Sequence, residues 1–315
     1  MGGAQLSRRT LLAGLALSPL AAAHAVRLAG EIRILGYNDM AEMIAALDGA
    51  FAALHPGISF RTELEGTRFG PAALAEGRAL IAPMGALFTP PQLAAYRAVA
   101  GRDPARFRIA HASLSPKALS GPNGVFVHRD NPLQAADLPA LASLFTQPGP
   151  HLWAELGAGG ALAGATIRIA GLSAETPLAL EMQAAAFPGL SFADDVMGFH
   201  QSRDVIAFVA AEPRALGFAA LNRASGPVRA LGLRRRPGAP ALFATEATLR
   251  AGAYPLDRHL WLYARQDARG RLDSRARAYI AFALSPRGQA IIGAGSLGYL
   301  PLGAGELERE RARLG

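Results

Sequence analysis

The residues best suited to chemistry lie in loops that lead from a strand into a helix. The first such loop is Gly36-Tyr37-Asn38-Asp39-Met40, which joins an apolar run at 32–35 to a helical pattern ending at Leu54. A glycine turn here leaves the first backbone N–H groups of the helix without intrahelical partners, in front of the positive end of the helix dipole. Such a junction suits an anion or a small polar ligand. We therefore take Asn38 and Asp39 as candidate ligand-binding residues.

Similar loops recur along the chain, at 67–70, 85–87, 173–176 and 201–203. They supply further candidates for ligand binding, which are Thr67, Arg68, Glu175 and Thr176. Any one of these loops alone could equally be an ordinary helix cap. Because several occur in one chain, we predict that they form the walls of a single binding site, where Arg203 could add a positive charge.

Catalytic motifs are missing from the sequence. There is no G-x-S-x-G, no G-x-x-x-x-G-K-[ST], and no G-x-G-x-x-G directly after a strand. The histidines at 55, 111, 128, 151, 200 and 259 lack the close spacing of metal ligands. Asp194-Asp195 is typical of a solvated turn, and Glu42 and Glu181 of surface positions on helices. We therefore predict no catalytic residue, metal or cofactor, and a protein that is not an enzyme.

The composition indicates a folded protein. The chain has 315 residues, of which 51% are hydrophobic and 18% charged, and it contains no cysteine. Disulfides, thiolate chemistry and a lipid-modified cysteine are thereby excluded. The formal charge of +8 comes from scattered arginines in an Ala-, Gly- and Pro-rich chain, a bias typical of a GC-rich genome. The charge is therefore no evidence for nucleic-acid binding.

The N-terminus reads as an export signal at 1–25. Arg8-Arg9 precedes a short apolar run that ends in Ala23-His24-Ala25, the small-x-small pattern of a signal peptidase site. The paired arginines resemble a twin-arginine signal. An uncleaved membrane anchor is the alternative, but the apolar stretch is short for a span. We expect export to the periplasm by the twin-arginine route and a mature chain beginning at Val26.

Strand-like and helix-like segments alternate along the mature chain, with Gly- and Pro-rich crossovers at 113–124 and 225–227. This order predicts an α/β protein of two lobes, each a mixed sheet with flanking helices, with the ligand between the lobes. The predicted boundaries are lobe 1 at 26–115 and 228–302, lobe 2 at 116–227, and a charged tail, a frayed helix, at 303–315.

Several segments resemble a known family. The chain resembles the PstS-like phosphate-binding proteins of ABC transporters, which have the type II periplasmic binding protein fold. The resemblance covers nearly the whole mature chain, and its clearest markers are 73–77 with 81–84, 125–133, 144–145, 216–219, 254–263, 282–289 and 298–302. Most of these segments are structural, so they are more specific for the fold than for the ligand.

The resemblance implies a periplasmic solute-binding protein that closes its lobes on phosphate or a similar small anion and delivers it to a membrane ABC permease. We expect a monomer. The ligand loops depart from the family pattern, because Asp39 stands in place of a hydroxyl and Ala174-Glu175-Thr176 in place of Ser-Gly-Thr. A different polar solute therefore remains an alternative, as does a non-transport partner or sensor module with a degenerate cleft.

Overall fold

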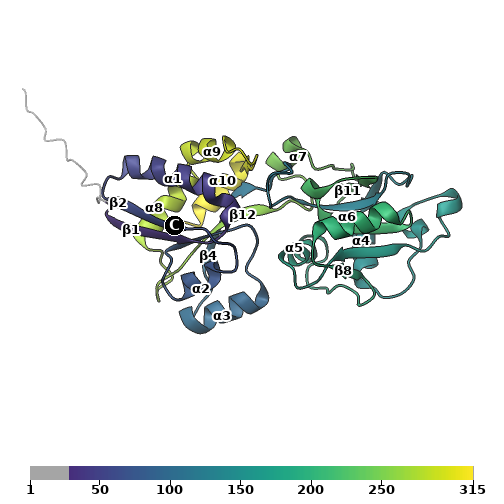
Figure 1. The fold of residues 1–315 in the computed structure, drawn as a ribbon, viewed down its shortest axis with the longest axis horizontal. Helices are drawn as coiled ribbons and strands as arrows, with labels where there is room; N and C mark the ends of the chain where they lie inside the picture. Colours follow the sequence, from purple (N-terminus) through teal and green to yellow (C-terminus); the bar gives the residue numbers. More distant parts are fainter. Residues whose placement is uncertain (1–27, 315) are drawn as a thin grey trace, which may run out of the picture.

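The computed structural model describes residues 28–314, so the predicted signal at 1–25 and the cleavage before Val26 lie outside the described residues. Two lobes lie side by side, and each has its own sheet with flanking helices (Figure 1). Each lobe also has its own core of buried apolar side chains. Nowhere in the described part is there a helix long and apolar enough to cross a membrane.

Lobe 1 is built on a six-stranded sheet in the order β13-β4-β12-β3-β1-β2. The strands are β1 (Gly30–Leu35), β2 (Ile58–Glu63), β3 (Ile81–Met84), β4 (Ala105–His111), β12 (His259–Ala264) and β13 (Leu300–Pro301). β1 runs parallel to β2 and β3, whereas β12 is antiparallel to β3 and β4. The sheet is therefore mixed, as predicted.

Helices cover both faces of this sheet, with α1, α9 and α10 above it and α2 and α3 below it in Figure 1. The helices of lobe 1 are η1 (Asn38–Met40), α1 (Ala41–Leu54), α2 (Gly70–Ala75), α3 (Pro90–Ala100), α8 (Ser274–Ala283), α9 (Pro286–Gly293) and α10 (Ala304–Ala312). Their starts follow from local sequence. Ser285, for example, accepts a hydrogen bond from Gly288 N and is followed by Pro286 at the first helical position.

Lobe 2 contains a five-stranded mixed sheet in the order β10-β5-β9-β7-β8 and a small two-stranded pair, β11-β6. The strands are β5 (Asn123–His128), β6 (Ala135–Asp137), β7 (Arg168–Leu172), β8 (Met197–Phe199), β9 (Ala215–Ala220), β10 (Val228–Ala230) and β11 (Gly232–Arg234). Its helices are α4 (Leu138–Thr146), η2 (Trp153–Leu156), η3 (Gly160–Leu162), α5 (Pro177–Ala186), α6 (Ser202–Ala211), η4 (Leu221–Arg223) and α7 (Glu246–Arg250).

Two crossovers connect the lobes and run side by side. Ala112 N donates to Arg258 O at 2.8 Å, and Asn123 N donates to Leu256 O at 3.1 Å. The second crossover therefore lies near 254–258. The sequence expectation placed it at 225–227 and began lobe 1 again at 228, which does not match the sheet pairing, because β10 pairs with β5 and β11 with β6 in lobe 2.

The charged tail is a packed helix and not the frayed helix that was expected. In α10, Glu306 and Glu310 are 7% and 1% exposed. Both carboxylates contact Arg108 of β4, at 3.4 and 2.6 Å. The charged sequence at 303–315 predicted a frayed helix, but these ion pairs attach α10 to the sheet of lobe 1.

Candidate functional site

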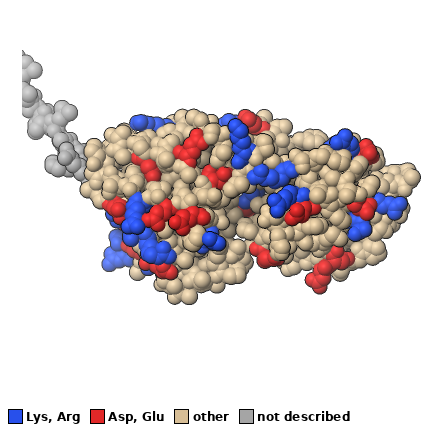
Figure 2. All heavy atoms as spheres, viewed as in Figure 1, with Lys and Arg blue, Asp and Glu red and all other residues tan. Residues whose placement is uncertain are grey.

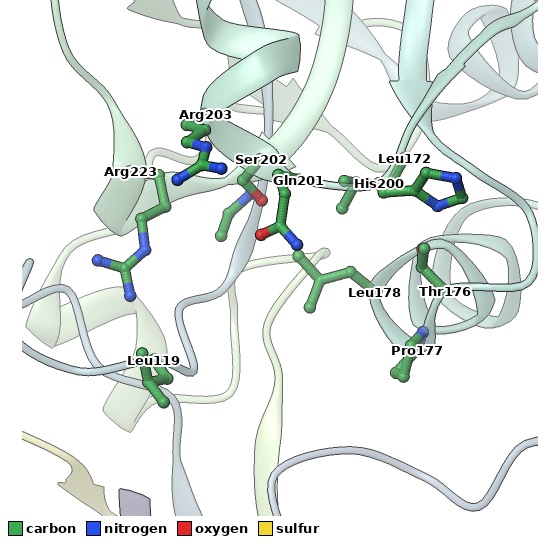
Figure 3. A pocket seen from close by; sticks show the side chains of 11 residues that line it. Leu119, Leu172, Thr176, Pro177, Leu178, His200, Gln201, Ser202, Arg203 and Arg223 are labelled. Atoms are coloured by element: carbon green, nitrogen blue, oxygen red, sulfur yellow. The ribbon is translucent and has the colours of Figure 1, made fainter.

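A cavity on the side of lobe 2 that faces the hinge lies at the ends of β7 and β9, where α5 and α6 begin. Its volume is about 580 Å³. Figure 3 shows the lining residues, which are Leu119, Leu172, Thr176, Pro177, Leu178, His200, Gln201, Ser202, Arg203, Ala220 and Arg223. All of them belong to lobe 2 except Leu119, which lies in the first crossover. The cavity is thus a lobe 2 surface that faces the hinge.

Helix N-termini and two arginines give this cavity a positive character. The first turns of α5 and α6 both contribute lining residues, and the N–H groups of Leu178, Ser202 and Arg203 there have no intrahelical partner. Arg203 and Arg223 stand on the same side of the cavity (Figure 3). Figure 2 shows that Lys and Arg side chains gather near the middle of the visible face, where the lobes meet.

The two arginines differ in how tightly they are held. The guanidinium of Arg223 donates to Pro116 O at 2.8 Å and to Ala118 O at 2.6 Å, which ties it to the first crossover. The side chain of Arg203 is 81% exposed, and its nearest carboxylate is Asp204 at 3.6 Å. Arg203 is therefore the cation that is more available to a ligand.

Of the six residues predicted to bind ligand, the structure places Thr176 in the wall of this cavity. Its hydroxyl donates to Ser173 O at 2.8 Å and accepts from Ala179 N at 3.3 Å, as the cap of α5. Glu175 lies beside it with a largely exposed side chain, and its carboxylate is 3.5 Å from His200 Nδ1. His200 lines the cavity, so Glu175 lies next to it without lining it.

Asp39 belongs to the hinge in this structure. Its carboxylate accepts a hydrogen bond from Leu119 N at 2.8 Å and another from the hydroxyl of Tyr299. Leu119 lies in the first crossover, and Tyr299 precedes β13. Asp39 and the exposed Asn38 do not line the lobe 2 cavity. The carboxylate that replaces a hydroxyl of the family pattern thus already accepts hydrogen bonds from two donors.

Thr67 and Arg68 lie at the start of α2 in lobe 1, also outside the lobe 2 cavity. The Arg68 guanidinium lies over the Phe69 ring, 4.6 Å from its centroid. Arg68 lines a separate small pocket between α2 and α3. The structure therefore does not bring the lobe 1 candidates together with Thr176.

The first loop of lobe 1 is shaped by Tyr37. A Cβ on Gly85 would lie 2.3 Å from the Tyr37 ring, so the ring occupies the space beside the end of β3. The phenol is 2.9 Å from Ser120 Oγ in the first crossover. Burial raises the pKa of Tyr37 to about 12, so the phenol is protonated at neutral pH. A tyrosine after Gly36 thus requires a glycine at 85.

A buried ion pair at the hinge was missed by the sequence reasoning, which placed Glu181 on the surface. Glu181 of α5 pairs with Arg258 of the second crossover, and Arg258 is 4% exposed. Arg258 also donates to Gly85 O at 2.8 Å and to Gly121 O at 3.0 Å. Glu181 accepts from Leu87 N at 3.3 Å. The only local signal was an arginine within the apolar segment 254–263.

The chain is similar to known phosphate-binding proteins along most of its length. No protein-family model matches the chain. A curated protein from Pseudomonas aeruginosa, named phosphate-binding protein PstS, is 22% identical over 293 residues, covering 91% of this chain and 87% of the relative.

Solved structures agree in fold. An ABC-type phosphate transport receptor from Vibrio cholerae superposes with a TM-score of 0.57 at 17% identity, covering 86% of this chain and 100% of the receptor. PstS from Borrelia burgdorferi gives a TM-score of 0.56 at 14% identity, covering 86% of this chain and 98% of PstS. The expected two-lobed α/β fold is confirmed. The chain is therefore similar, along nearly its whole length, to PstS-type phosphate-binding proteins and has their fold.

Proposed function

We propose that this protein is a periplasmic solute-binding protein of an ABC transporter, and that it binds phosphate or a related small oxyanion between its lobes. The observation that carries the proposal is the convergence of the α5 and α6 N-termini with Arg203 on one cavity beside the hinge. The names of the relatives support the same reading, since they are phosphate-binding proteins and transport receptors.

The binding chemistry follows from the needs of an oxyanion. A buried anion requires several hydrogen-bond donors and a compensating cation, because an unpaired charge in a dry cleft is very costly. The N–H groups of Ser202 and Arg203 at the start of α6 and of Leu178 in α5 supply donors, and the Arg203 side chain supplies the positive charge. Thr67, Arg68 and Asn38 on lobe 1 would reach the anion when the lobes close about the crossovers at 112–122 and 254–258.

A transport role implies a membrane permease as the partner of this protein. The receptor acts as a monomer, is exported through the twin-arginine route, and passes its ligand to a membrane permease without covalent chemistry. Binding to the permease would follow lobe closure, because closure alters the surface that both lobes present together. Glu181 and Arg258 are positioned to hold α5 of lobe 2 against the hinge during that motion.

A different solute is the second candidate, and one observation favours it. Three leucines line the lobe 2 cavity, Leu119, Leu172 and Leu178, although a small oxyanion has no apolar part. Gly85 and Ala174 also lack the hydroxyls of the family pattern. A solute with an anionic group and an apolar part would use both kinds of wall.

The test is calorimetric titration of the mature, phosphate-free protein with phosphate, with sulfate as the matched control. We expect one phosphate per chain and a Tm that rises with phosphate concentration, as for any ligand that binds only the folded state. A response to an organic phosphate or phosphonate but not to phosphate would favour the second candidate. No heat and no Tm change with any anion at millimolar concentration would contradict both and leave the partner-module alternative.

A further inference from the structure

The buried His111, the half-buried His259 and the buried Glu306 meet in lobe 1, far from the cavity described above. His111 ends β4 and His259 begins β12, and the two are paired across the strands. Their ring centroids are 4.9 Å apart. Glu306 of α10 lies near the Nε2 atoms of both rings, and one side-chain atom from each of the three residues falls within 4.8 Å of the others. The histidines are distant in sequence, so spacing alone could not pair them.

The orientation of His111 is set by Asp257. His111 Nδ1 is 2.6 Å from Asp257 Oδ2, so the Nδ1–H group can donate a hydrogen bond to the Asp257 carboxylate. This arrangement turns Nε2 toward Glu306. A carboxylate that accepts from the far nitrogen of a histidine is the usual support of a metal-binding imidazole, because it selects the tautomer and fixes the ring.

The Nε2 atoms of both histidines point into this cluster without a hydrogen bond. His111 is fully buried, and within residues 28–314 neither Nε2 atom has a hydrogen-bond partner of acceptable geometry. Oxygens of Glu306 are nevertheless close, 2.9 Å from His111 Nε2 and 3.4 Å from His259 Nε2. The carboxylate therefore lies off the direction that a ring N–H would take.

The charges around the cluster also favour a cation. Arg108 contributes positive charge through Nη1, 3.4 Å from Glu306, but its Nε lies closer to Glu310, at 2.6 Å. Arg313 pairs with Glu310 as well, at 2.8 Å. Gly303 N donates to the other oxygen of Glu306 at 3.2 Å. Arg108 and Arg313 thus form their shorter ion pairs with Glu310. The carboxylates of Asp257 and Glu306 face the two imidazoles.

We propose that His111, His259 and Glu306 bind a divalent transition-metal ion of the zinc class, with Asp257 as the residue that positions His111. Two imidazole nitrogens and one carboxylate oxygen are a typical zinc donor set, with water as a fourth ligand. Metal bonds of about 2.0–2.1 Å at tetrahedral angles separate ligand atoms by roughly 3.3 Å. His111 Nε2 lies 2.9 Å from Oε2 of Glu306 and His259 Nε2 lies 3.4 Å from Oε1, so each imidazole has a different carboxylate oxygen at about that separation.

The bound ion would have a structural role that is independent of the proposed transport function. It would join three parts of lobe 1, namely β4, β12 and the C-terminal helix α10. Asp257 adjoins Arg258, so the site also holds the second crossover. Metal binding therefore stabilises the folded lobe and attaches α10 to it.

The experiment is calorimetric titration of chelator-treated, tag-free mature protein with Zn²⁺ in phosphate-free buffer. We expect one Zn²⁺ per chain and a Tm that rises with Zn²⁺ and falls again with chelator. His259→Gln should weaken Zn²⁺ binding at least tenfold, and Asp257→Asn by about 10- to 100-fold. His128→Gln in lobe 2 is the matched control and should bind Zn²⁺ as the wild type does.

If the His259→Gln variant folds poorly, Co²⁺ binding to the wild-type protein provides a second test. Tetrahedral Co²⁺ absorbs strongly in the visible range, so its binding can be measured from this absorbance. Displacement of this absorbance by Zn²⁺ would support the site. The proposal is overturned if the wild type shows no Zn²⁺ heat and no Tm change below millimolar Zn²⁺. It is also overturned if His259→Gln folds and binds Zn²⁺ with unchanged affinity.

Discussion

Arg258 and Glu181 form a buried ion pair that joins the second crossover to α5 of lobe 2. The two side chains are 3% and 10% exposed. Arg258 also reaches the backbone of lobe 1 at Gly85 and the first crossover at Gly121, so one guanidinium contacts both lobes and both connections. The hinge of this protein is thus built around a charge pair that has little contact with water.

Arg258→Ala should lower the free energy of unfolding by about 3–5 kcal/mol, because Glu181 would be left buried and unpaired. Urea unfolding measures the change. The double variant Arg258→Met with Glu181→Leu should recover part of the loss, since it removes both charges. Arg61→Ala is the control, as it breaks an exposed pair with Glu63 and should change stability little. A double variant less stable than Arg258→Ala would contradict this interpretation.

Gly85→Ser should destabilise the protein by about 1–3 kcal/mol, because its Cβ would overlap the Tyr37 ring. Combining it with Tyr37→Ser should cost less than the sum of the two single changes, because the smaller side chain makes room. Thermal unfolding of all four proteins gives the coupling. Gly49→Ser is the control, since a Cβ there meets nothing within 4 Å. Strict additivity would show that the two positions are independent.

Asp39→Ala should reduce stability by about 1–3 kcal/mol and should not strengthen phosphate binding. The carboxylate accepts from the exposed Leu119 N and from the buried Tyr299, so its loss leaves the Tyr299 hydroxyl without this partner at the hinge. Calorimetry with phosphate, alongside urea unfolding, measures both effects. Tyr299→Phe should also lower the free energy of unfolding, but by less than Asp39→Ala does. A rise in phosphate affinity on removing Asp39 would instead place the carboxylate next to the bound anion.

Arg203→Ala should weaken phosphate binding by about tenfold or more, the equivalent of one charge-assisted hydrogen bond. Its side chain is 81% exposed, so the fold should be unaffected. Calorimetric titration measures the affinity, and circular dichroism checks the fold. Arg129→Ala, another exposed arginine of lobe 2 that lies outside the cavity, is the matched control. Equal affinities of the two variants would remove Arg203 from the site.

His151 should stabilise lobe 2 most strongly at acidic pH. Burial lowers its pKa, but the carbonyl of Gln147 at 2.9 Å and the carboxylate of Glu155 at 2.7 Å raise it more, so the net pKa is raised. A folded pKa above the unfolded value of about 6.5 means that the stabilisation is complete below pH 6.5. It is lost as pH rises through the folded pKa.

The measurement is the difference in urea midpoint between wild type and His151→Gln across this pH range. That difference should shrink as the pH is raised from acidic to alkaline. His128→Gln serves again as the control. A difference that grew with pH would show that the neutral imidazole, and not the imidazolium, is the stabilising form.

The local sequence was sufficient for the elements and the fold class. The apolar run at 32–35 lies in the strand Gly30–Leu35, and the helical pattern that ends at Leu54 is the helix Ala41–Leu54, because apolar periodicity and turn residues act over a few positions. The first crossover of the structure, at 112–122, overlaps the Ser-, Pro- and Gly-rich stretch at 113–124. The return crossover was misplaced, because a Gly-Pro turn at 226–227 inside lobe 2 looks the same in sequence as a hinge.

Only the tertiary structure decided what the charged side chains do. Asp39 finds its donors 80 and 260 residues away, and Glu181 pairs with an arginine 77 residues away. His111 meets His259 across two strands that are neighbours only in the folded sheet. From sequence alone, a charged residue is predicted to be exposed unless an oppositely charged residue lies nearby in the chain. Burial and pairing depend on contacts between distant segments, which local patterns do not encode.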